Sequence, residues 1–313
     1  MKKLKNILSS RWFQLGFSAL LIFVAFRKIN IAKLFNEVQQ VPWWVVVALL
    51  AYMAISMIVG GLRWSVLVFE KVTFKDVLAF TRATYAGCFY SLFFPSSVGG
   101  DLLKWTSLLK KYPHISKFKL AGTALIDRVI GFSAFAIVAM IALIVGKLLK
   151  YQFPDILFWL FLGISLALIV FYVLVFNLDF EKILSLAKHL WFSKYLNKLF
   201  EIIDLLKRGN KKRILICFLI SIIAEPTWIM MTWFTSLAVG ARLKILEVFI
   251  FMPIISLILV LPISWAGFGA RENLFLLFFS QLGVSPEKLI LISAFGGVLG
   301  ILNSLLGGLV LLF

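Results

Sequence analysis

The amino-acid sequence predicts an all-α polytopic membrane protein with six spanning helices and two re-entrant helical hairpins, arranged as an inverted repeat. Three observations predict it: an apolar composition, the lengths of the apolar runs, and a motif that occurs twice. Of 313 residues, 62% are hydrophobic and 15% charged, whereas a soluble domain is nearer half apolar and a quarter charged. The composition excludes a water-soluble enzyme, and we expect one transmembrane domain over 1–313, multi-pass in the cell (plasma) membrane.

Six apolar runs are expected to cross the bilayer. A span needs about 20 residues at 1.5 Å per residue, and five runs meet this length. The first run is short, but it follows a basic N-terminus and lacks a small-residue cleavage site, so we interpret it as a retained helix that begins a turn earlier. The expected spans are 12–26, 41–61, 118–146, 156–176, 214–239 and 289–312.

Two further stretches are expected to enter and leave the membrane on the same side. The runs 248–263 and 273–282 are too short to cross singly, and the segment that joins them holds two glycines and two charges. This pattern is typical of a re-entrant hairpin, here 248–283. The run 77–94 has spanning length, but a hairpin over 77–112 keeps the basic segments of the chain on one side.

The net charge of +18 predicts the orientation. Under this topology, 21 Lys and Arg residues lie in the N-terminus, 61–76, 101–119 and 177–213, against 8 in the segments on the other side. The positive-inside rule then places both termini in the cytoplasm. The segment 177–213 has apolar residues at helical spacing among its cations, so we expect an amphipathic linker on the anionic leaflet, with a specific partner as the alternative.

The motif that occurs twice lies at the apices of the two hairpins. Each copy has a proline, a serine two residues later, a glycine five later and a cation nine later: Pro95, Ser97, Gly100 and Lys104, then Pro262, Ser264, Gly267 and Arg271. The match extends to the flanking segments and divides the chain into repeat one, 12–146, and repeat two, 156–312, which contains the linker. The hairpins open to opposite sides, as in the inverted repeats of secondary transporters. The alternative is coincidence in an apolar chain.

Charged residues at membrane depth are the candidates for function. They cost several kcal/mol in the bilayer unless they face a cavity or a partner, and structural ion pairs are the competing explanation. The broken apices also leave N–H groups at helix N-termini, where an anion such as phosphate binds, with Lys104 and Arg271 as countercharges. The predicted substrate-binding residues are Ser97, Gly99, Gly100, Asp101, Lys104, Asp127, Arg128, Glu225, Ser264, Gly267, Gly269, Arg271 and Glu272.

Metal and cofactor chemistry have no support in the sequence. His114 and His189 have no Cys, His or carboxylate at ligand spacing. Cys88 and Cys217 lie in apolar runs, where a free cysteine usually acts as a small hydrophobic residue. We expect no catalytic residue, no metal, no cofactor and no nucleic acid partner.

Three sequence strings resemble a known family. The strings are FPSSVGGD at 94–101, LIDR at 125–128 and LPISWAGFGARE at 261–272. They are similar to signatures of the lysylphosphatidylglycerol synthase transmembrane family, the flippase-like domain of the multiple peptide resistance factors, and the resemblance covers nearly the whole chain. It implies movement of a lipid or lipid-linked headgroup between leaflets. Lys104 and Ala266 stand where the family often has Arg and Gly.

The first functional hypothesis is therefore a flippase for an anionic, phosphate-containing lipid, such as a phospholipid or a polyprenyl phosphate. No soluble aminoacyl-transfer domain follows Phe313, so lysine transfer to lipid is not expected. A membrane-embedded transferase acting on a polyprenyl-phosphate-linked or phospholipid substrate is the alternative, and it would need an acid/base or metal-binding carboxylate cluster. The sequence also leaves open an accessory subunit for a lipid-modifying enzyme, and a homo-oligomer.

Overall fold

The computed structural model describes residues 11–27, 29–93, 100, 103–177, 201–204, 211–261 and 264–311. These residues form helices and contain no strand. Most of the expected linker 177–213 lies outside the described residues, as do Ser97, Gly99 and Asp101 at the first apex.

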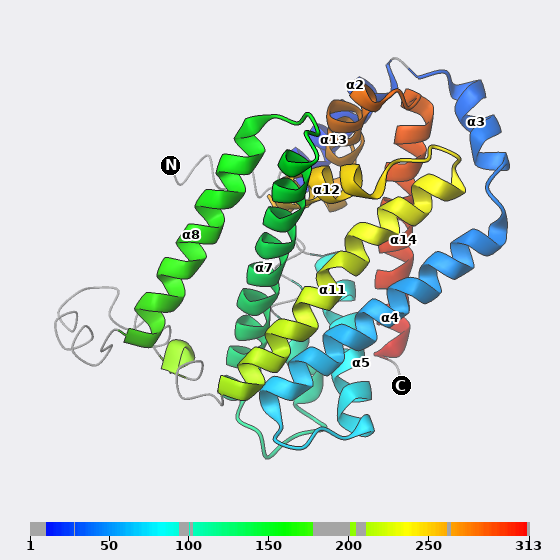
Figure 1. Ribbon diagram of the computed structural model, residues 1–313. Helices are drawn as coiled ribbons and strands as arrows, with labels where there is room; N and C mark the ends of the chain where they lie inside the picture. The colour runs from blue at the N-terminus through cyan, green and yellow to red at the C-terminus, as the bar shows by residue number, and fades with distance from the viewer. Residues whose placement is uncertain are drawn as a thin grey trace.

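Five helices are long and apolar enough to cross a membrane, which confirms a polytopic helical membrane protein. They are labelled in Figure 1 and are α4 (Trp43–Val68), α7 (Lys117–Leu148), α8 (Asp155–Asn177), α11 (Lys211–Ala238) and α14 (Pro286–Val310). The helix α2 (Arg11–Phe26) has 16 residues and is shorter than this criterion requires.

The helix α4 extends seven residues beyond the apolar run expected to end at residue 61. Leu62, Trp64 and the apolar residues up to Val68 continue the helix, and Trp64 is fully buried. Arg63, which the topology argument assigned to a cytoplasmic loop, therefore lies inside a helix.

The shorter helices occupy the regions of the expected hairpins and the connection after α2. In Figure 1, α5 lies in the lower half of the bundle, whereas α12 and α13 lie in the upper half. The bounds are α3 (Ile31–Gln39), α5 (Phe74–Ser91), η1 (Lys104–Leu108), α12 (Ile245–Leu259), η2 (Trp265–Gly267), α13 (Ala270–Phe279) and η3 (Ser280–Leu282).

The break between α12 and α13 has an irregular backbone. Ala266, Gly267 and Gly269 have φ of 49°, 79° and 76°, in the left-handed region where glycine is favoured. Ala266 carries a Cβ in this conformation, which gives a physical reason for glycine at that position. The chain turns here and begins α13 in a new direction.

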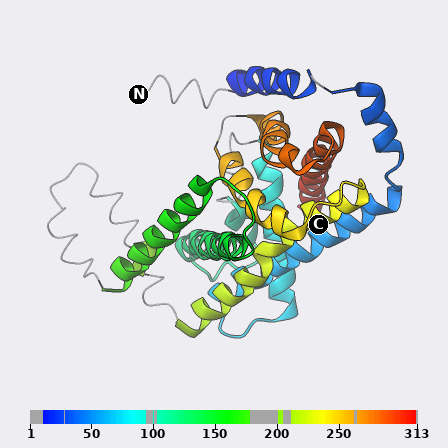
Figure 2. The same cartoon turned by 45° about the horizontal axis from the view of Figure 1, so that its top comes forward.

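Helix packing joins elements both within one half of the sequence and between the two halves. The helix α4 packs on both α5 and α11, α5 packs on α14, and α12 packs on α7. The approach of α5 to α14 depends on Gly307, because a Cβ there would overlap the backbone carbonyl of Tyr85. The helix α8 lies on the outside of the bundle beside α7 (Figure 2), and its apolar surface is mostly exposed.

Candidate functional site

A cavity of about 620 Å³ lies at the centre of the bundle. Helices of both halves line it, including α4, α7, α11 and α14, together with the break between α12 and α13. Its charged lining residues are Arg63, Lys104, Asp127, Arg128, Glu225 and Arg271. Four cations and two carboxylates leave these residues with a formal charge of +2.

Arg63 of α4 joins three helices. Its Nε lies 2.6 Å from Oδ1 of Asp127 and its Nη2 donates to Oδ2 at 3.2 Å, which is a bidentate pair with α7. Its Nη1 donates to Oγ of Ser221 at 3.3 Å and approaches Oε1 of Glu225 at 3.4 Å, both on α11. Gly131 permits this arrangement, since a Cβ there would lie 3.1 Å from Nη1 of Arg63.

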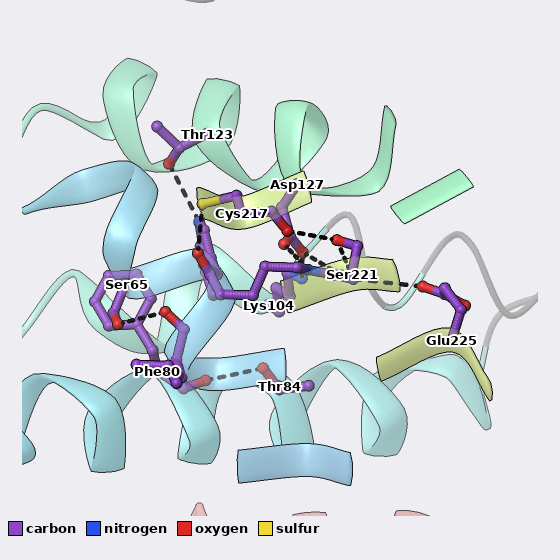
Figure 3. Close-up of polar contacts among 12 residues, drawn as sticks. Ser65, Phe80, Thr84, Lys104, Thr123, Asp127, Cys217, Ser221 and Glu225 are labelled. Carbon is purple, nitrogen blue, oxygen red and sulfur yellow. Dashed lines mark hydrogen bonds and ion pairs between the residues drawn. The ribbon is translucent and has the colours of Figure 1, made fainter. Parts of the chain in front are cut away.

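Lys104 binds the same carboxylate. Its Nζ lies 2.9 Å from Oδ2 of Asp127 and 4.7 Å from the centre of the Trp64 ring (Figure 3). Lys104 is 3% exposed and Asp127 is 1% exposed. A buried carboxylate needs such partners, because an uncompensated charge there costs several kcal/mol. The geometry gives Lys104 a structural role as counterion of Asp127, beyond the role of phosphate ligand that the sequence predicted.

Glu225 is held less tightly than Asp127. Its one described ion pair is the 3.4 Å contact with Arg63, and its side chain is 20% exposed beside the cavity. Figure 3 shows Glu225 at the far end of the network from Lys104, with Asp127 and Ser221 between them. The network therefore has a buried end at Asp127 and a cavity-facing end at Glu225.

Arg271 lies at the second hairpin apex. The Nη2 of Arg271 donates to the carbonyl of Ala266 at 3.5 Å. Gly297 of α14 leaves room for the Nη1 of Arg271, because a Cβ at residue 297 would lie 2.5 Å from that atom. That Nη1 is buried and has no hydrogen-bond partner among the described residues. A buried cationic donor without an acceptor is unfavourable, so the position suits an anion.

Glu272 turns away from the cavity although it follows Arg271 in sequence. Its carboxylate accepts a hydrogen bond from the backbone N–H of Gly269 at 2.6 Å and faces Ser293 Oγ at 3.5 Å. It therefore caps the N-terminus of α13 and neutralises the partial positive charge there. The anion that we expected at this helix end is thus the protein's own carboxylate.

The structure brings seven of the predicted residues to the cavity: Lys104, Asp127, Arg128, Glu225, Ser264, Gly267 and Arg271. Glu272 and two glycines do not line it. Gly100 packs against the backbone of Ser91, and Gly269 packs against α2, where a Cβ would lie 2.8 Å from the carbonyl of Ser18. Ser97, Gly99 and Asp101 lie outside the described residues.

Sequence reasoning missed Arg63 and Ser221. A usable signal for Arg63 was present, because the cavity-lining residues Met53, Met57, Gly60 and Arg63 recur every three or four positions along one helix face. For Ser221 the signal was its position four residues before Glu225 on α11, which places the two side chains on the same helix face.

The comparisons with known proteins give one match. A family model described as the lysylphosphatidylglycerol synthase TM region matches residues 11–307. The comparison with curated proteins and the comparison with solved structures give no match.

Proposed function

The chain belongs to the lysylphosphatidylglycerol synthase transmembrane family, and we propose that it moves a lipid with an anionic, phosphate-containing headgroup between the leaflets of the plasma membrane. The membership supports a membrane function related to lipid. The observation that carries the rest is Arg271, whose buried Nη1 has no partner among the described residues and lies at the edge of the central cavity.

A phosphate fits the charge of this cavity. Its lining residues have a formal charge of +2, and Arg63 and Lys104 are already engaged with Asp127. Arg271 is therefore the cation best placed to receive an anion, and guanidinium binds phosphate oxygens through parallel N–H donors. Each such charged hydrogen bond is worth about 1.5–3 kcal/mol.

An inverted repeat would let the cavity open to either side. In the two repeats, α5 corresponds to α12 and α7 corresponds to α14. The packing of α5 on α14 therefore has a counterpart in the packing of α12 on α7, and both contacts are present. The hairpin regions lie in opposite halves of the bundle in Figure 1. These features support two re-entrant hairpins and alternating access by motion of one repeat against the other. We further propose α2 as a sixth span and, from the distribution of the cations along the sequence, cytoplasmic termini.

We propose transport without a chemical step or a cofactor. The two carboxylates that line the cavity, Asp127 and Glu225, both contact Arg63, so each is placed as an ion-pair partner rather than as a general base. The proposed partners are membrane lipids with anionic headgroups.

A leaflet assay in proteoliposomes tests this function. Fluorescent phosphatidylglycerol is placed in both leaflets, and a membrane-impermeant reductant reports how fast inner-leaflet lipid reaches the outer leaflet. The loss of one charged hydrogen bond should slow Arg271→Ala by about 10- to 100-fold, with Arg271→Lys intermediate. The matched control is Arg82→Ala, which removes an exposed cation that does not line the cavity. Wild-type rates no faster than empty vesicles would reject the function.

A further inference from the structure

The helices α7 and α14 begin in the same way. Each follows an N-cap serine with nearly the same backbone angles, φ −60° and ψ 141° at Ser116 against φ −62° and ψ 143° at Ser285. The eleventh residue after the serine is Asp127 in α7 and Gly296 in α14. In Figure 1 the two helices run in opposite directions, because α7 ends near the start of α8 at the top, whereas α14 ends near the C-terminus below. Gly296 therefore stands, in an inverted arrangement, where Asp127 stands in the first half of the chain.

The cations that follow the two hairpin apices also correspond, but they differ in the anion they meet. Lys104 and Arg271 each stand nine residues after an apex proline, and the segments that begin with them pack in matching pairs, η1 on α7 and α13 on α14. Lys104 Nζ lies 2.9 Å from Oδ2 of Asp127. The Nη1 of Arg271 is buried and has no hydrogen-bond partner among the described residues. The first half of the chain thus supplies an anion to its cation, and the described part of the second half does not.

The wall of α14 that faces Arg271 is made of glycine. A Cβ at Gly297 would lie 2.5 Å from Nη1 of Arg271, whereas a Cβ at Gly296 would meet no atom within 4 Å. Both glycines and Arg271 line the central cavity. Glu272 follows Arg271 in sequence, but its carboxylate accepts the backbone N–H of Gly269 at 2.6 Å. A ligand in the cavity can therefore approach Nη1 of Arg271 along the glycine wall.

We propose that the headgroup phosphate takes, beside Gly296, the place that the carboxylate of Asp127 takes in the first repeat, and that it binds Nη1 of Arg271 there. Carboxylate and phosphate oxygens accept hydrogen bonds from a guanidinium in the same geometry, so one can replace the other. Gly296 then determines binding, because an acidic side chain at this position would act as an internal anion. The identity of the ligand rests on the proposed function, whereas the pairing of residue 296 with Arg271 does not.

A lipid suits this position better than free phosphate. The apolar side chains of Leu259, Phe275 and Ile292 line the same cavity, and Leu259 approaches the apex beside Arg271, since a Cβ at Gly267 would lie 3.3 Å from its Cδ2 and 3.2 Å from Nη2 of Arg271. Apolar surface next to a cation fits a phosphodiester that is attached to a glycerol and its acyl chains.

Thermal unfolding of the full chain in detergent, with and without added phosphatidylglycerol, tests the placement. At about 100 times its Kd, the lipid should raise the Tm of the wild-type protein by roughly 5 °C, and its neutral methyl phosphotriester should not. Gly296→Asp should raise the Tm without lipid, because its carboxylate pairs with Arg271, and should abolish most of the lipid-dependent rise. In an Arg271→Ala background, the same substitution should instead lower the Tm, because a buried carboxylate is left unpaired.

Gly300→Asp is the matched control. It also adds a carboxylate to the cavity wall where a Cβ meets no atom within 4 Å, but it lies one helical turn beyond the position that corresponds to Asp127. We expect it to lower the Tm without lipid and to keep a larger lipid-dependent rise than Gly296→Asp. Equal effects of the two substitutions would overturn the placement, and so would a fall in the lipid-free Tm of Gly296→Asp when Arg271 is present.

Two further arms identify the ligand and separate this site from the proposed function. Inorganic phosphate that raises the Tm as much as phosphatidylglycerol at equal concentration would overturn the lipid headgroup as the ligand. The expected Tm shifts without movement of lipid between leaflets would reject the proposed function and leave the anion site beside Gly296. Movement of lipid by Gly296→Asp at the wild-type rate would overturn the site and leave the proposed function.

Discussion

The ion-pair network around Arg63 makes a quantitative prediction about stability. Arg63→Leu removes the bidentate pair with Asp127, so that Lys104 is the remaining described ion-pair partner of Asp127. The same substitution removes the one described ion pair of Glu225. Breaking a buried pair from one side typically costs 3–5 kcal/mol, because a charge is left uncompensated. We expect a loss of about that size, which for a chain of this length is a fall in Tm of roughly 6–15 °C.

A second substitution tests the charge argument. Arg63→Leu removes the 3.4 Å ion pair of Glu225 and leaves that carboxylate with the weaker attraction of Arg128. Glu225→Gln in that background removes a carboxylate that has lost its closest cation, while the Lys104–Asp127 pair remains. The double variant should therefore recover about 1–3 kcal/mol relative to Arg63→Leu.

Thermal unfolding of the purified protein in detergent, followed by intrinsic tryptophan fluorescence, measures both changes. Arg82→Leu serves as the control, because Arg82 is exposed. A fall in Tm of less than about 2 °C for Arg63→Leu would show that the Arg63 ion pairs contribute little to stability. Further destabilisation of that variant by Glu225→Gln would show that Glu225 does not need Arg63 as its counterion.

Three other substitutions follow from local geometry. Ala266→Gly should raise stability by about 0.5–1 kcal/mol, because relief of the left-handed Cβ clash exceeds the added chain entropy; a lower Tm would contradict this. Gly307→Ala should cost about 1–3 kcal/mol by forcing α5 from α14, whereas Gly300→Ala, which meets nothing within 4 Å, should not destabilise, and equal Tm values for the two would contradict the packing argument. Burial and the hydrogen bond to Glu247 raise the pKa of Tyr151, in the α7–α8 loop, to about 12. The neutral hydroxyl of Tyr151 therefore contributes to the free energy of unfolding below pH 10, and this contribution is lost as the pH rises through 12. Tyr151→Phe should be less sensitive to alkali in a pH series of unfolding curves, and an unchanged alkaline profile would count against the hydrogen bond.

The sequence was sufficient to predict the long helices but not to predict which residues pair with the charges inside them. The runs that became α7, α8, α11 and α14 are long enough for their length alone to predict a span, although α7 contains Asp127 and Arg128 and α11 contains Glu225. In α4 the lone charge of Arg63 ended the predicted run, although the helix continues to Val68. A partner could remove the cost of that charge, but Asp127 lies 64 positions away in the chain, and no local pattern encodes such a contact.

The two charged residues after the second apex show the same limit. Arg271 and Glu272 are adjacent in sequence, and neighbours on a helix point about 100° apart, so the sequence predicts that they face different sides. It does not predict which one faces the cavity. That depends on the direction of α13, which places Glu272 over the N–H of Gly269 and turns Arg271 toward the apex backbone at Ala266.

We propose that the cavity carries an anionic phosphate headgroup across the membrane, and a comparison of two lipids tests this proposal. The most direct measurement compares, in the same proteoliposomes, a fluorescent phosphatidylglycerol with its neutral phosphotriester, in which a methyl group removes the charge that Arg271 would bind. We expect the anionic lipid to change leaflet at least tenfold faster than the phosphotriester, and this difference to disappear in Arg271→Ala. Equal rates for the two lipids in the wild-type protein would contradict it.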